Sequence, residues 1–219
     1  MPTDIIITGR ANVSQKPDCI NLHIRLKAQG VDYGTTLEKL NAAVQHTLQS
    51  IQAVGVDEEP QTASYSVEED WADPYDDRKK KFLGYVSEQM LTVRIPLDMQ
   101  MLGKVLENLS DQETKPSVHL YFEVRDLLKM QAEARHKAIE AAALAANDIA
   151  AQLGLSLAAV KSVKYDMPFG GSGSTLNIDM DDSLEAMSEP IAKASFAPQI
   201  NPEDVTSRDT ILITWACTQ

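Results

Sequence analysis

Four histidines are the side chains of this chain best suited to metal binding or to proton transfer near neutral pH. His23 and His119 fall on the polar faces of two expected strands, where they could meet across a sheet. A metal site would need at least a third ligand held nearby, and the pattern supplies none. His46 and His136 fall on expected helices and belong to no HExxH motif. We therefore interpret His23 and His119 as exposed strand histidines and predict no metal site.

The two cysteines, Cys19 and Cys217, stand almost at opposite ends of the sequence. Neither is part of a CxxC pair, and two thiols alone cannot form a structural zinc site. Cys19 precedes an apolar series that starts at Ile20, whereas Cys217 belongs to the apolar series that includes Trp215. If both series face a core, the two thiols point to opposite faces, which disfavours a disulfide. We expect two free thiols.

Two segments rich in glycine or in carboxylates resemble ligand sites only superficially. Gly170–Ser174, with the sequence GGSGS, lacks the lysine and the helix start of a phosphate loop and is typical of a flexible linker. Asn177–Glu185 clusters carboxylates but lacks the central glycine and the terminal glutamate of an EF-hand loop. No GxSxG motif is present, and no two carboxylates are spaced as an acid–base pair. The sequence predicts no catalytic, cofactor-binding or metal-binding residues, and a protein that is not an enzyme.

The charge and hydropathy of the chain restrict its partners. A net charge of −12 on 219 residues argues against a nucleic-acid partner, because phosphate binding needs a concentrated basic surface. No run approaches the ~18 apolar residues of a membrane span. The start, MPTDIIITGR, has neither a basic segment nor a long apolar one, so no signal peptide is expected. We expect a cytoplasmic location for the sequence as it stands, or a periplasmic or secreted one if a leader has been removed.

Helical and alternating hydrophobic patterns predict the elements that carry these residues. One helix is expected from a capping box at Thr35–Glu38 to a stop at Gly55. Asp98 can cap a second, short helix, and an alanine-rich helix is expected over Leu127–Leu153. The expected packing face of the alanine-rich helix consists of Ala138, Ile139, Ala142, Ala146, Ile149 and Leu153. Expected strands cover Ile5–Val13, Ile20–Ala28, Thr62–Glu69, Gly84–Ile95, Val118–Val124, Val160–Tyr165 and Thr210–Cys217.

The order of these elements predicts an α+β fold, an antiparallel sheet with helices packed on one face, in a single domain over residues 1–219. We expect a duplicated β-α-β-β unit, over residues 20–95 and 117–217, because a long loop joins the last two strands of each half. These loops, 68–83 and 166–209, are expected to form long hairpin arms. Exposed aromatic side chains are common interface anchors. The candidate contacts between subunits are Trp71, Tyr75, Phe169 and Phe196.

Short motifs in a fixed order give the sequence a resemblance to a known family. Gly9-Arg-Ala11 and then Pro17-Asp18 precede an alternating strand. The glycine is expected to bend or bulge the first strand, and the Pro-Asp pair to set a turn. Further motifs are Gly55-Val56, Thr62, Gly84-Tyr85, Ala134, Lys137-Ala138, Ala142, Leu153-Gly154 and Asn201-Pro202. Over nearly its whole length the chain resembles the SIMPL-domain family.

The resemblance implies α+β domains with helices against an antiparallel sheet. Many members of that family are periplasmic or secreted, some are linked to tolerance of oxidative stress, and some resemble ring-forming oligomers. The family has no agreed catalytic residues, so none is transferred to this chain. The expected lack of a leader departs from the family pattern.

Three hypotheses follow for function. The first is a non-enzymatic, oligomer-forming SIMPL-like protein of unknown biochemical role, related to the envelope or to stress, whose partners are copies of itself. The alternative is a small-molecule binding protein with a pocket between sheet and helix. The third and weakest is an enzyme that uses His23, His119 or Asp18, which would require a strongly shifted titration in a cleft.

Overall fold

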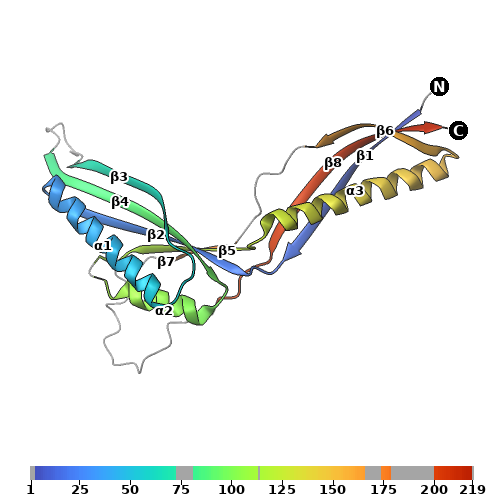
Figure 1. The fold of residues 1–219 in the computed structure, drawn as a ribbon. Coiled ribbons are helices and arrows are strands. Elements are labelled where there is room, and N and C mark those ends of the chain that lie inside the picture. Colours follow the sequence, from blue (N-terminus) through green and yellow to red (C-terminus); the bar gives the residue numbers. More distant parts are fainter. Residues whose placement is uncertain (1–2, 73–80, 113, 166–173, 179–199, 219) are drawn as a thin grey trace. The chain divides into compact units, whose positions relative to one another are not determined.

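The computed structural model describes residues 3–72, 81–112, 114–165, 174–178 and 200–218 (Figure 1). These residues form strands and helices in an α+β arrangement with two antiparallel sheets, so the predicted fold class is confirmed. The strands are β1 (Thr3–Gln15), β2 (Cys19–Gly30), β3 (Gln61–Ala72), β4 (Lys81–Pro96), β5 (Ser117–Glu123), β6 (Ser156–Tyr165), β7 (Ser174–Ile178) and β8 (Val205–Thr218). The helices are α1 (Tyr33–Ala53), α2 (Met99–Ser110) and α3 (Leu127–Gln152).

The first of two compact units, here called the α1 unit, contains the described residues of 18–122 and 175–202. Its sheet has the strand order β3-β4-β2-β5-β7, and β4 pairs antiparallel with both β2 and β3. α1 packs on β2 and β4 and contacts α2 (Figure 1). The predicted alternation of β2 is confirmed, because its apolar series is buried against the two helices: Ile20, Leu22, Ile24, Leu26 and Ala28.

The second compact unit, the α3 unit, contains the described residues of 1–17, 123–174 and 203–219. Its sheet has the order β1-β8-β6, with β8 antiparallel to both neighbours. α3 packs along β1 and β8, as Figure 1 shows. Trp215 and the isoleucines at positions 5, 211 and 213 form the core of the unit together with buried alanines of α3.

Small residues bring α3 close to the sheet. Its alanines at positions 134, 138, 142, 146 and 150 are buried, whereas Ile139, Ile149 and Leu153, which the sequence pattern placed on the same side, are exposed. A row spaced by four residues turns slowly around a helix with 3.6 residues per turn, so it can follow a twisted sheet. The predicted packing face is therefore correct for the alanines and wrong for these three larger residues.

Gly9 of β1 lies directly beneath α3. A Cβ atom at this position would overlap the carbonyl oxygen of Ala138 and would lie 2.8 Å from the Cβ of Ala142. The pairing of β1 with β8 is unbroken from Thr3 to Gln15, so the expected bend or bulge at Gly9 is wrong. Glycine is needed here because a helix backbone passes over the strand, a role that a strand pattern alone cannot distinguish from a bulge.

The predicted duplication is not confirmed. Residues 20–95 do form β2, α1, β3 and β4 in the expected order. Residues 117–217, however, divide between the two sheets, because β5 joins the five-stranded sheet while β6 and β8 join the three-stranded one. Hydrophobic periodicity identifies strands but carries no information on which sheet each strand enters.

Candidate functional site

An exposed aromatic cluster lies where β3 and β4 approach the start of α1. We call its four residues the hairpin cluster: Tyr33, Trp71, Phe82 and Tyr85. Their rings meet edge to face in a row, with centroids 5.1 Å apart for Trp71–Phe82, 5.3 Å for Phe82–Tyr85 and 5.3 Å for Tyr33–Tyr85. Trp71, Tyr33 and Phe82 are nevertheless 46%, 49% and 38% exposed. The cluster is an ordered aromatic surface and not part of the core.

Strand register and two tight backbone features position the hairpin cluster. Trp71 pairs directly with Phe82 across the β3–β4 ladder, just after an irregularity between Asp70 and Trp71. Gly84 has a φ of +137°, and a Cβ there would overlap the carbonyl oxygen of Gly30, so β4 can pass this point only with glycine. The indole N–H of Trp71 donates a 3.0 Å hydrogen bond to the Glu69 carboxylate, which fixes the ring.

Two apolar residues near the hairpin cluster in the sequence, Val31 and Leu83, are also exposed. Exposed apolar surface on a charged protein marks interaction sites, and Trp, Tyr and Phe are enriched in them. The chemistry of the hairpin cluster is therefore that of a protein-binding surface.

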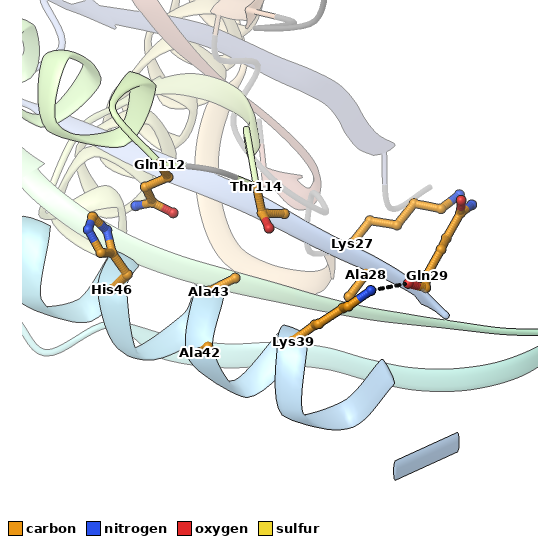
Figure 2. A pocket seen from close by; sticks show the side chains of 9 residues that line it. All are labelled: Lys27, Ala28, Gln29, Lys39, Ala42, Ala43, His46, Gln112 and Thr114. Atoms are coloured by element: carbon orange, nitrogen blue, oxygen red, sulfur yellow. Dashed lines mark hydrogen bonds between the residues drawn. The ribbon is translucent and has the colours of Figure 1, made fainter. Parts of the chain in front are cut away.

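A pocket of about 460 Å³ lies in the α1 unit, between the C-terminal end of β2 and α1 (Figure 2). We call it the α1 pocket. β2 and α1 supply most of its wall, and the segment between α2 and β5 supplies the rest. It is lined by Lys27, Ala28, Gln29, Lys39, Ala42, Ala43, His46, Gln112 and Thr114. A pocket between sheet and helix is the geometry that the alternative hypothesis requires, in a size range that accommodates small molecules.

Hydrogen bonds hold polar side chains of the α1 pocket, among them Gln112 and Lys39. Gln112 is buried, and its Oε1 accepts a 3.1 Å hydrogen bond from the buried hydroxyl of Thr47. Its Nε2 is buried as well and finds no hydrogen-bond acceptor among the described residues. The Lys39 ammonium donates a long 3.4 Å bond to the carbonyl of Gln29. The amide of Gln112 thus lies within the wall of the pocket, and its Nε2 has no contact with solvent.

The structure places the residues singled out in the sequence at different positions, and some of them lie outside the described residues. Trp71 lies in the hairpin cluster, whereas Tyr75, Phe169 and Phe196 lie outside the described residues. The His23 ring packs against Tyr121 with centroids 4.5 Å apart. His46 lines the α1 pocket, and His136 lies 3.1 Å from Glu140 on α3. Within the described part of the chain, no three His, Cys, Asp or Glu side chains are placed to hold a metal ion.

Both cysteines are buried and neither forms a disulfide, as predicted. Cys19 belongs to the α1 unit and Cys217 to the α3 unit. The side chain of Cys19 is fully buried beside Ile20 at the start of β2.

The sequence matches the family model SIMPL, described as a protein of unknown function (DUF541), over residues 5–215. This match covers nearly the whole chain and both compact units. The chain belongs to the SIMPL family. A search of curated proteins finds no match. None of the described helices of this SIMPL protein is both long and apolar enough to cross a membrane. Membership confirms the resemblance drawn from the short motifs, and it leaves the biochemical role to be argued from the site.

Proposed function

We propose that this SIMPL protein is a non-enzymatic, self-associating scaffold whose subunits meet through the hairpin cluster. The observation that supports the proposal is a row of four edge-to-face aromatic rings, three of which are more than one-third exposed. Aromatic anchors carry much of the energy of protein interfaces, at about 2 kcal/mol or more for each central residue. Two such residues removed together would weaken association by roughly three orders of magnitude, since every 1.4 kcal/mol is a factor of ten.

The proposal is tested by light scattering after size exclusion on the full chain. The wild-type protein is expected to form an assembly, and the double variant Trp71→Ala, Phe82→Ala to elute as a monomer. Tyr65→Ala is the matched control, because Tyr65 is an exposed aromatic residue on the same strand but outside the hairpin cluster. A monomeric wild-type protein, or an assembly that the double variant leaves intact, would contradict the proposal.

A second candidate function is small-molecule binding in the α1 pocket. The specific observation in its favour is the pocket of about 460 Å³ that lies between β2 and α1. The two functions are compatible, because the hairpin cluster and the α1 pocket share no residue.

A further inference from the structure

We propose that the hairpin cluster of one subunit binds, on a second copy of the chain, the face of the three-stranded sheet that lies opposite α3. We call this surface the open face. The inference rests on the proposed function and names the surface that the hairpin cluster meets. Such a contact is heterologous, because two different surfaces meet, so an assembly can grow beyond two subunits.

The open face presents an apolar centre to solvent. Strand alternation directs Ile5 toward α3 and Ile6 to the opposite side of the sheet. Of the described helices only α3 belongs to this unit, and it packs on the side of Ile5. Ile6 is 61% exposed, and Leu212, its diagonal neighbour in the β1–β8 register, is half-buried. A partner that supplies apolar surface would remove both side chains from water.

The charged groups that the strands of the open face carry are all known, because every residue of β1, β6 and β8 is described. The face has one carboxylate, that of Asp4, and Lys161 already pairs with it. Among the described residues no carboxylate pairs with the other three cations. These cations are the exposed side chains of Arg10, Lys164 and Arg208. They are the groups on this face to which carboxylates of a partner would bind.

The hairpin cluster has the complementary chemistry. The Glu69 carboxylate accepts the indole N–H of Trp71, and Glu69 pairs with Tyr85 in the β3–β4 register. An anion therefore lies within the aromatic row. The arm 68–83 carries six carboxylates and four basic side chains, so its net charge is negative. Rings beside a carboxylate on one surface match apolar side chains beside cations on the other, and cations are also attracted to the faces of aromatic rings.

Electrostatics favours the meeting of unlike surfaces over the meeting of like ones. If two hairpin clusters met around a two-fold axis, the Glu69 carboxylates and the acidic arms of both copies would come together. If two open faces met, their cations would come together. Like charges at an interface oppose association, whereas opposite charges fix the register and orientation of a contact.

Mixing two variants of the full chain, followed by light scattering after size exclusion, tests the inference. The cluster variant is Trp71→Ala, Phe82→Ala, and the face variant is Arg10→Glu, Lys164→Glu. Each variant alone lacks one of the two surfaces and is expected to associate at least tenfold more weakly than the wild type. In an equimolar mixture the intact cluster of one variant meets the intact open face of the other. A complex of two subunits is therefore expected, and nothing larger.

Lys104→Glu, Lys115→Glu is the matched control for the face variant. It makes the same change in net charge at exposed residues of the α1 unit, outside both surfaces, and should assemble as the wild type does. If it dissociates as the face variant does, net charge and not the open face controls assembly, and the inference is wrong.

The remaining outcomes separate this inference from the proposed function. A face variant that assembles like the wild type would overturn the open face as the partner surface and leave self-association through the hairpin cluster in place. A mixture that stays monomeric, or that grows beyond two subunits, would overturn the inference in the same way. A monomeric wild-type protein, or a cluster variant that assembles normally, would overturn both.

Discussion

Gly9→Ala is expected to destabilise the α3 unit by about 3 kcal/mol, and Gly9→Val by more. The added Cβ would overlap the carbonyl oxygen of Ala138 and approach the Cβ of Ala142. A backbone carbonyl cannot rotate away as a flexible side chain can, so the whole of α3 would have to lift from β1. That movement would weaken the contacts of the buried alanine row, which holds the helix on the sheet.

The two tryptophans of the chain allow each unit to be followed separately. Trp215 is buried in the core of the α3 unit, and Trp71 belongs to the α1 unit. In a Trp71→Phe background, fluorescence of Trp215 during urea unfolding should show the midpoint of Gly9→Ala shifted to lower urea. In a Trp215→Phe background, fluorescence of Trp71 should show no shift.

Thr8→Ala is the control for Gly9→Ala. Thr8 is the preceding residue of β1 and is exposed, and strand alternation places it on the sheet face opposite Gly9. Its substitution should change the free energy of unfolding by no more than about 0.5 kcal/mol. If Gly9→Ala behaves like Thr8→Ala, then α3 has room to move and the close approach is not what requires glycine.

Local sequence patterns predicted the elements of this fold well wherever a single pattern, such as strand alternation or a helix cap, determines the structure of a segment. The alternation of β2 predicted its buried face, and Asp98 caps α2 by accepting bonds from the amides of Gln100 and Met101. Where two local signals competed, the prediction was wrong. α1 begins at Tyr33 with Asp32 as its cap, not at the expected Thr35 box, since Asp32 accepts the amide of Thr35 at 3.0 Å. Both Asp and Thr are favoured caps, so composition alone does not choose between them.

The candidate site was predictable only in part, because it joins distant segments. Trp71 was identified from its place in a charged arm, but its ring partners were not. Phe82 could have been found from hairpin pairing, which sets it opposite Trp71. Tyr33 reaches the cluster only through the packing of α1. The α1 pocket was expected in general terms, and Gln112 was missed because nothing in its local sequence distinguishes it from a surface glutamine.

Arg135→Met is expected to lower the free energy of unfolding of the α3 unit by about 3 kcal/mol, and Asp209→Asn by less. The difference arises because the first substitution leaves a buried charge without a partner and the second leaves an exposed one. The Asp209 side chain is only 1% exposed, whereas that of Arg135 is 40% exposed, and the two lie 3.7 Å apart. Tyr165 joins them, since its hydroxyl donates to Asp209 at 3.0 Å and accepts from the Arg135 guanidinium at 2.9 Å. Removing the arginine leaves a buried carboxylate without its cation. Removing the carboxylate charge leaves a guanidinium that water can reach, so Asp209→Asn should cost only about 1 kcal/mol.

The same Trp215 fluorescence measurement checks this order, with the double variant closing a mutant cycle. Arg135, Tyr165 and Asp209 form one hydrogen-bonded network, so the cost of the double variant should be smaller than the sum of the single ones by roughly 1 kcal/mol. Lys137→Met is the control, because Lys137 lies on the same helix and pairs with the exposed Glu133 at 2.8 Å. That pair lowers the pKa of Glu133 through the hydrogen bond and charge of Lys137, yet both groups remain in solvent. A larger cost for Asp209→Asn than for Arg135→Met would show that the hydrogen bonds of the carboxylate, and not burial of an unpaired charge, hold β6 and β8 to α3.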